Sequence, residues 1–418
     1  MTTFATVSPR FWAVCLTLAL LFSVSLPAAH AQDDDDDLPT VDFAVKAMQS
    51  AQFLRTEGGD LEQPSDDAEF GFHRFRYNLE VSAQLHERIS VFVDLGHEPN
   101  DFGTGGNSFA PAVDYAAFDV ALNDQWTFRA GTPVTSLFNF RGYSDGAATQ
   151  SNPLIGNSPI DFITAETGVA LIGDLGNAGF DVTWTSPTFF ETFEPGTGFS
   201  VIAKGQFQAT PVFQLGGAIG LGTSGSVVDR GNGSSDAALV NWITGDGENY
   251  NLPLAGGRGG MPNRVTHAYL LPGASPLMLQ ADARADFGVA VLDVWGGWGE
   301  EEYSFGTLSE TGTFVPGAAG SNIVEEDSQM WWLGGTAKLN LTPRFYIAGR
   351  GSVANNASDW AEDLDETSLW RVQGGIGISL FERALLKLEV VHQNEGINSP
   401  GQVGENWTGG LAELSVGF

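Results

Sequence analysis

The stretch HRFRYNLEVSAQL, residues 73–85, alternates two kinds of side chain over its whole length. The odd positions, from His73 to Leu85, are mostly apolar, and the even positions, from Arg74 to Gln84, are all polar. Because successive side chains of a β-strand point to opposite faces, this alternation predicts a strand with one apolar and one polar face. In a soluble sandwich the apolar face would pack inward, whereas in a membrane barrel it would meet lipid and the polar face would line water.

The beginning of the chain has the pattern of a secretory signal. Arg10 precedes an apolar run at 11–26, and Ala29–Ala31 has the small-x-small form that a signal peptidase cleaves. We therefore expect a signal peptide at 1–31. An anchoring helix is the weaker interpretation, because the run is short for a membrane span and acidic residues follow it.

This interpretation divides the chain into three parts. The signal peptide at 1–31 is followed by an acidic tail at 32–40, which contains five consecutive aspartates, and then by a barrel at 41–418. Cys15 is the only cysteine and lies within the signal. The exported chain would therefore have no disulfide and no cysteine-based metal site.

The composition excludes several classes of protein. The 418 residues include 51 Asp and Glu but only 19 Lys and Arg, which gives a formal net charge of −32. Such an acidic chain lacks the basic groups that phosphate contacts need, so we expect no nucleic-acid partner. Beyond the signal, no apolar stretch approaches the roughly 18 residues of a transmembrane helix. The 53 glycines and the short alternating runs are typical of an all-β protein.

Short and long connections alternate along the chain. Seven short polar turns lie near 85–88, 122–125, 174–179, 208–211, 285–288, 340–343 and 381–384. Eight longer connections lie near 56–69, 98–112, 134–164, 187–198, 224–274, 299–326, 355–367 and 395–405. Together they delimit sixteen strands, the first near 41–54 and the last at 406–418. We therefore predict an all-β fold, a transmembrane antiparallel β-barrel of sixteen strands with short periplasmic turns and long external loops.

Aromatic residues gather at the ends of the expected strands, as in the interfacial girdles of membrane barrels. On the turn side they are Trp126, Phe180, Phe345 and Phe418, and on the loop side they are Phe75, Tyr77, Trp184, Trp331 and Trp370. Many positions of the opposite phase are Gly, Ser, Thr, Asn, Gln or charged residues. We therefore expect a wet lumen rather than a packed core.

On these features the chain resembles the trimeric sixteen-stranded porins of Gram-negative outer membranes. Its closing strand GLAELSVGF ends in Phe418, with Val416 and Leu414 in the same outward phase, and is similar to the terminal signal for membrane insertion of such barrels. The resemblance implies a passive diffusion channel for ions and small hydrophilic solutes. It also implies a homotrimer in the outer membrane, in contact with lipid and lipopolysaccharide, but it identifies no subfamily.

In that family the third long loop folds into the lumen and narrows it, and the segment 132–162 holds the corresponding place here. This segment is less acidic than its neighbours and carries the apolar residues Leu137, Phe138, Phe140, Leu154 and Ile155. A loop against a barrel wall can bury such groups, whereas an exposed loop has little reason to carry them. We expect 132–162 to constrict the pore; packing on other loops or on another subunit is the alternative. Its acids are Asp145 and Asp161, and its only base is Arg141.

Extending the inward phase of each strand collects charged residues on the lumen side. The bases are Lys46, Arg74, Arg76, Arg129, Lys204, Arg284, Lys338, Arg344, Arg350, Arg371 and Lys387. The acids of the same phase are Glu80, Asp94, Asp119, Asp181, Asp282, Asp293, Glu389 and Glu413. The resemblance implies a row of arginines on one wall opposite acids of the inserted loop. By position and phase, this role falls to Arg74, Arg76 and Arg129, facing Asp145.

The acidic loops leave three interpretations open: a solvated surface that tolerates high salt, a site for divalent cations that bridge lipopolysaccharide, or a mouth that repels anions. No spacing matches a calcium loop, an HExxH helix or a GxSxG elbow, so we assign no metal, no cofactor, no catalytic residue and no enzymatic activity. The second hypothesis for the function is a closed structural or adhesive barrel whose loops bind ligands. Single-channel conductance would separate it from an open pore.

Overall fold

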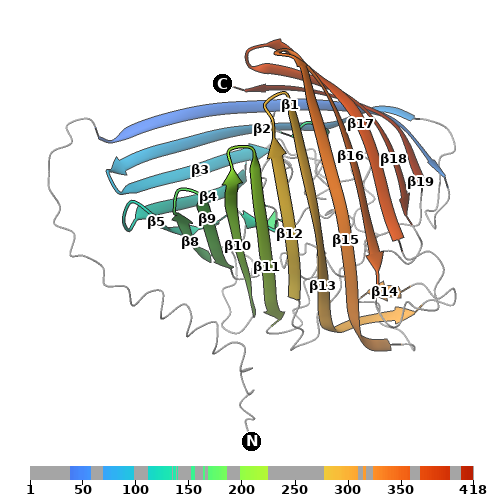
Figure 1. Cartoon of the computed structure of the whole chain (residues 1–418), viewed down its shortest axis with the longest axis horizontal. Helices are drawn as coiled ribbons and strands as arrows, with labels where there is room; N and C mark the ends of the chain where they lie inside the picture. The colour runs from blue at the N-terminus through green and yellow to red at the C-terminus, as the bar shows by residue number, and fades with distance from the viewer. Residues whose placement is uncertain are drawn as a thin grey trace, which may run out of the picture. The chain divides into compact units, whose positions relative to one another are not determined.

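Sixteen antiparallel strands form a closed ring in the computed structural model of the chain (Figure 1). The sheet has seventeen strands in all, but the short β14 (Phe314–Pro316) pairs only with β13 and is not part of the ring. The structure describes residues 38–57, 69–97, 112–133, 135–137, 139, 152–155, 163–164, 168–185, 198–224, 277–308, 314–316, 323–357, 368–395 and 406–417. None of these residues forms a helix that could cross a membrane.

Each strand of the ring pairs with its neighbours in chain order. The strands are β1 (Thr40–Glu57), β2 (Glu69–His86), β3 (Ile89–His97), β4 (Ala112–Ala121), β5 (Trp126–Gly131), β8 (Gly168–Asp174), β9 (Ala178–Thr185), β10 (Gly198–Thr210), β11 (Phe213–Ser224), β12 (Leu277–Asp286), β13 (Ala290–Leu308), β15 (Ile323–Thr342), β16 (Phe345–Asn356), β17 (Ser368–Phe381), β18 (Ala384–Glu395) and β19 (Asn406–Gly417). The ring closes between β1 and β19, where Lys46 faces Gly417 and Glu57 faces Asn406. A separate pair, β6 (Thr135–Ser136) with β7 (Ile163–Thr164), lies between β5 and β8 in the sequence.

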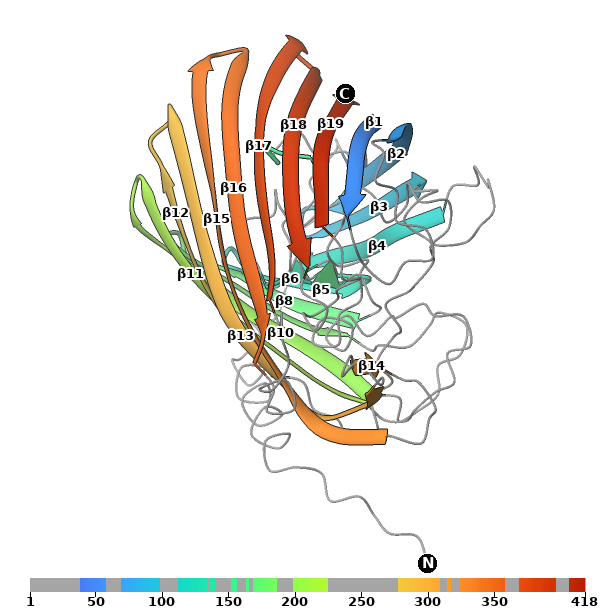
Figure 2. The same cartoon turned by 90° about the vertical axis from the view of Figure 1, so that its right-hand side faces the viewer.

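The ring confirms the predicted number of strands and the antiparallel barrel fold. One long connection is shorter than expected. The interval 299–326 is mostly strand, because β13 continues to Leu308 and β15 begins at Ile323. Figure 2 shows both strands curving at this end. Since backbone hydrogen bonds between strands require no apolar side chains, the hairpin continues into a stretch rich in glutamates, which the sequence analysis assigned to a loop.

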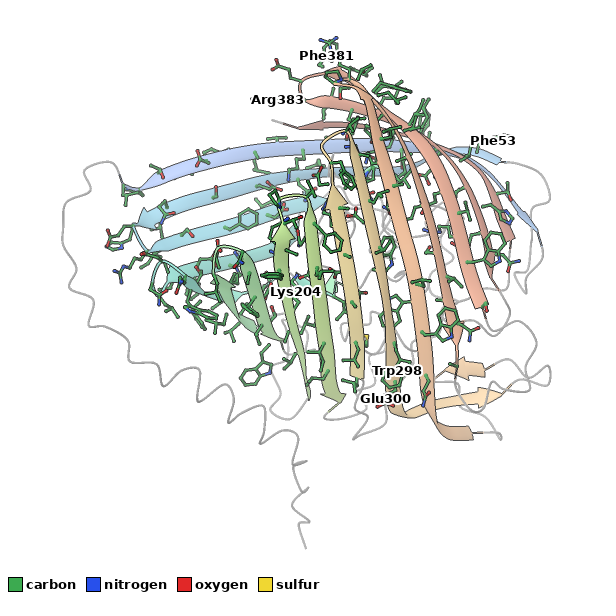
Figure 3. All side chains as sticks on the ribbon, viewed as in Figure 1. Phe53, Lys204, Trp298, Glu300, Phe381 and Arg383 are labelled. Carbon is green, nitrogen blue, oxygen red and sulfur yellow. The ribbon has the colours of Figure 1, made fainter. Side chains whose placement is uncertain are left out.

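The outward face of the ring is apolar, as the alternation predicts. Val372 and Val390 are 54% and 67% exposed, whereas Arg371 and Glu389, the residues before them, are buried. Large exposed apolar side chains occur on strands throughout the ring, among them Phe53 and Phe381, which Figure 3 labels. An apolar belt of this extent suits contact with lipid and would be unfavourable in water.

The quoted stretch of β2 contains a β-bulge. Phe75 pairs with Gln49 of β1, but Ala51 pairs with Phe72, so one residue of β1 faces two residues of β2. The extra residue reverses the phase on the N-terminal side of Phe75, so that even-numbered residues point outward there. Phe72 accordingly is 76% exposed. The predicted strict alternation is therefore wrong at this end of the stretch, and phase alone no longer places Arg74 on the inner wall.

Part of the inner wall is apolar rather than wet as predicted. Trp295 on β13 and Trp332 on β15 point inward, and both are buried. A Cβ atom added at Gly334 would lie 2.5 Å from the ring of Trp295, and one added at Gly297 would overlap the ring of Trp332. Each tryptophan therefore covers the backbone of a glycine on the neighbouring strand. The glycines of these strands give space to large side chains and do not simply line water.

The purified protein should migrate faster in SDS before boiling than after it. A closed ring has no free edge strand, so detergent alone should leave it compact. The measurement is gel mobility with and without boiling, together with a circular-dichroism spectrum dominated by β-structure. Equal mobility under the two conditions would contradict closure of the ring.

Candidate functional site

The described residues of the segment 132–162, between β5 and β8, contact the inner wall at two places. The first attachment joins Leu137 and Asn139 to Gln280 and Asp282, two inward-facing residues of β12. Gln280 Nε2 donates a hydrogen bond to the carbonyl oxygen of Leu137 at 2.9 Å, and Asn139 Nδ2 donates one to Asp282 Oδ2 at 2.9 Å. Leu137 is 1% exposed. The segment therefore lies inside the ring at this point.

Two residues of other strands, Gly216 on β11 and Trp332 on β15, prepare the first attachment. Gly216 on β11 pairs with Asp282, and a Cβ atom at position 216 would collide with the Asp282 carboxylate and the Asn139 amide. Trp332 Nε1 donates to Gln280 Oε1 at 3.1 Å, which leaves Nε2 of the same amide free to face the segment. The wall thus supplies an open space and an oriented donor.

The second attachment joins Asn152–Ile155 to the inner faces of β16, β17 and β18. Four wall side chains donate to it: Arg350 Nη2 to Asn152 Oδ1 at 2.9 Å, the Tyr346 hydroxyl to the Pro153 carbonyl at 3.1 Å, Lys387 Nζ to the Leu154 carbonyl at 3.3 Å, and Gln373 Nε2 to the Ile155 carbonyl at 3.4 Å. All four donor side chains are buried. These hydrogen bonds therefore face little competition from water, which makes them effective in fixing the segment.

Glu389 supplies the acceptor of the second attachment. The backbone N–H of Ile155 donates to Glu389 Oε2 at 2.6 Å, and Gln373 Nε2 donates to Glu389 Oε1 at 2.8 Å. Glu389 is 4% exposed, and Arg350 and Arg371 act on it electrostatically. A buried carboxylate is tolerated only when it is hydrogen-bonded and close to positive charge, and this cluster provides both.

Ion pairs occupy much of the described inner wall. Four join residues that face each other across neighbouring strands: Asp119–Arg129 at 2.7 Å, Asp181–Lys204 at 3.9 Å, Arg284–Asp293 at 3.4 Å and Lys387–Glu413 at 2.8 Å. A fifth joins Lys46 to Glu80. Figure 3 labels Lys204 on β10. Directly opposed charges of opposite sign stabilise a sheet, and they also leave each pair with little net charge.

No family model and no curated protein matches the sequence. Solved structures match it over most of its length. The anion-selective porin of Comamonas acidovorans aligns at 12% identity and a TM-score of 0.52, covering 91% of this chain and 100% of that one. OmpF of Salmonella typhi aligns at 9% identity and a TM-score of 0.55, and the outer membrane channel DcaP of Acinetobacter baumannii at 10% and 0.53; both cover 93% of this chain and 100% of their own. The fold is that of a sixteen-stranded porin.

Within this porin fold, only one residue of the predicted constriction has a described side chain. Arg129 forms two hydrogen bonds with the carboxylate of Asp119, an acid of the wall, at 2.7 and 2.8 Å. Arg74 and Arg76 lie on β2, but their side chains are outside the described residues. The predicted residues that lie wholly outside the described part of the chain are Arg141, Asp145 and Asp161.

Two further predictions concern the ends of strands of the porin fold. Arg344 lies in the exposed turn between β15 and β16, so the inward position predicted for it is wrong. Leu414 and Val416 are exposed on the outer face of β19, which confirms their outward phase, whereas Phe418 lies outside the described residues. Among the described side chains, no group of three or more His, Cys, Asp or Glu could hold a metal ion.

The attachments depend on residues that the sequence analysis did not single out. Asn139, Asn152, Gln280 and Gln373 are uncharged and belong to no motif. For the two glutamines on the wall, the inward phase of their strands was the one available signal. The apolar character of 132–162 did indicate burial, and Leu137, Leu154 and Ile155 are indeed buried.

Proposed function

We propose that the chain is an outer-membrane channel through which ions and small hydrophilic solutes diffuse passively. The observation that carries the proposal is the difference between the two faces of the ring: the outer face is apolar, and the inner wall carries the ion pairs described above. This arrangement suits lipid outside and water inside. The solved structures with the same fold include an anion-selective porin and an outer membrane channel, which supports the proposal.

The segment 132–162 is the proposed constriction. Its first attachment is on β12, and its second is on β16 to β18, beyond β13 and β15 along the wall. The chain between Asn139 and Asn152 must therefore connect two separate regions of the inner wall. Because buried side chains fix both attachments, we infer that the segment narrows the lumen permanently and does not act as a mobile lid.

A closed structural or adhesive barrel with ligand-binding loops is the second candidate. The observation that favours it is the apolar part of the inner wall, where Met278, Trp295 and Trp332 point inward and are buried. Apolar side chains packed inside a ring could block it, as in a protein core. The charged and hydrogen-bonded parts of the wall favour the open channel instead.

Several other parts of the proposal rest on the sequence patterns and on the resemblance to porins. They comprise a homotrimer, contact with lipid and lipopolysaccharide, a signal peptide at 1–31, an acidic tail at 32–40, use of Leu414, Val416 and Phe418 as a signal for membrane assembly, and a charged constriction lined by Arg74, Arg76, Arg129, Arg141, Asp145 and Asp161. The first of these is open to direct measurement by cross-linking in detergent.

In planar lipid bilayers the purified protein should produce conductance steps of uniform size. The step size should increase nearly in proportion to the salt concentration, because ions in a water-filled lumen move much as they do in bulk solution. A boiled sample at the same detergent concentration is the control. Protein that inserts as a compact barrel but produces no steps would contradict the channel and would favour the closed barrel.

A further inference from the structure

One lysine of the inner wall lacks the partner that the others have. The chain contains four lysines, and all four lie on strands of the ring. Three of them pair with carboxylates: Lys46 with Glu80, Lys204 with Asp181, and Lys387 with Glu413. Within the part of the chain that the structure describes, no carboxylate lies within ion-pair distance of Lys338; its recorded contact is with an aromatic ring.

The position of Lys338 on β15 directs its side chain into the ring. Trp332 and Thr336, which have the same phase, are buried, whereas Leu333 and Leu339, of opposite phase, are exposed on the outer face. Lys338 is half-buried, so part of its side chain remains exposed inside the ring. Among the described lysines, Lys338 therefore brings a positive charge to the lumen without a paired acid.

The ring of Tyr346 holds this charge beside the inserted segment. Lys338 Nζ lies 4.5 Å from the ring centroid. An aromatic face attracts a cation but has no net charge, so the positive charge is positioned and not neutralised. The ring is itself fixed, because it lies over Gly377, where a Cβ atom would overlap it, and because its hydroxyl donates to Pro153. Tyr346 thus links Lys338 directly to the second attachment.

Other charges act on Lys338 from a greater distance. Arg284 and Lys387 are cationic neighbours, and Asp286, at the end of β12, acts in the opposite direction. Arg284 and Lys387 each have an acid at ion-pair distance, which offsets their charge. Among the described residues, no acid offsets the charge of Lys338 in this way.

We propose that Lys338 sets the charge selectivity of the pore by attracting small anions to the lumen beside the second attachment. The inference rests on the proposed channel function and names the solutes that this part of the wall favours: small hydrated inorganic or carboxylate anions, recognised by charge and not by shape. A fixed charge is effective in a narrow passage, because a passing ion cannot move away from it. Arg129 is a weaker source of selectivity, because two hydrogen bonds to Asp119 pair its charge.

The test compares Lys338→Gln with the wild type in a planar bilayer under a KCl gradient, at a mean ionic strength near 0.1 M. The anion-to-cation permeability ratio, obtained from the reversal potential, should fall by roughly threefold to tenfold, the effect expected for one unit charge a few ångströms from the ion path in water. Lys338→Met, which keeps contact with the ring, should give the same fall, and Lys338→Arg should restore the ratio. At 1 M salt the fall should shrink, since the screening length decreases from about 10 Å to about 3 Å.

Arg383→Gln is the matched control, because it removes one positive charge from the exposed turn between β17 and β18; Figure 3 labels Arg383. It should leave the ratio near the wild-type value. If Lys338→Gln conducts, migrates as a compact barrel and changes the ratio no more than Arg383→Gln does, the inference is wrong and the channel stands. If the glutamine variant alone shifts the ratio and the methionine variant does not, packing rather than charge explains the effect, and the inference is also wrong. A wild-type protein without conductance would instead refute the channel itself.

Discussion

Removal of Phe138–Asn157 should raise the single-channel conductance severalfold and admit larger solutes. The deletion removes the Asn139 side of the first attachment and the whole segment side of the second, so the proposed constriction loses its fixed contacts with the wall. The ring should stay closed, because none of its strand pairs involves these residues. Conductance in bilayers and the swelling of liposomes in sugars of increasing size measure the two effects.

A deletion of equal length within 225–274 is the control for this experiment. That connection joins β11 to β12, and its removal should leave conductance near the wild-type value if it lies outside the ion path. The wall acids and bases that lose their partners in the first deletion would meet water in the wider lumen, which limits the loss of stability. An unchanged conductance, in a variant that still migrates as a compact band, would contradict the constriction.

Replacement of Glu389 by leucine should destabilise the second attachment by about 3–5 kcal/mol, the usual effect of removing one partner from a buried charged network. The backbone N–H of Ile155 and the amide of Gln373 would lose this acceptor, and Arg350 and Arg371 would lose an acid that interacts with them electrostatically. A released segment should make the open-channel current noisy, with excursions above the wild-type level. Current noise and the temperature at which the unboiled band disappears are the measurements.

Glu389→Gln is the matched variant, because an amide keeps one acceptor oxygen and nearly the same volume. Its current noise and its thermal stability should both lie between those of the wild type and those of Glu389→Leu. If Glu389→Leu has wild-type current noise and wild-type thermal stability, Glu389 does not hold the segment.

The ring was predictable from the sequence because its determinants are local. Alternation with a period of two and short turns at regular intervals specify each hairpin separately, and the hairpins in order make the ring. The bulge in β2 was missed although the sequence marks it, because the aromatic residues change from even positions, Phe70 and Phe72, to an odd position at Phe75. The extent of β13 and β15 was missed because their glutamates are typical of a loop but do not prevent backbone pairing.

The attachments could not be predicted because their partners are distant in the chain. Asn152 and Arg350 are 198 residues apart, and Ile155 and Glu389 are 234 residues apart. Such contacts depend on the register of strands in between, and a shift of one residue in any of them would turn the partner to the lipid side. Single residues such as Asn152 also have no pattern of their own, whereas the apolar residues of the inserted segment do.

Glycines of the inner wall illustrate what a linear pattern leaves out. In the sequence they indicate close packing, bending or a small pore-lining residue, but not which part of the chain packs there. In the structure a Cβ atom at Gly375 would lie 3.0 Å from Leu154 of the inserted segment, and one at Gly216 would collide with the first attachment. At these two glycines the inserted segment packs directly against the wall. This role depends on the position of the segment, which the pattern of one strand does not contain.

The pairing of β1 with β19 has a consequence for how the protein is made. Glu57 pairs with Asn406, so the first strand cannot acquire its second partner until nearly all of the chain has been exported. Pairing over such a separation is intrinsically slow, and until it happens both terminal strands present open backbone groups that can recruit other chains. A chaperone that shields these strands during transit would therefore matter more than intrinsic folding speed. Deletion of β1 should impair assembly as much as deletion of β19, because either deletion leaves the ring open where these two strands would pair.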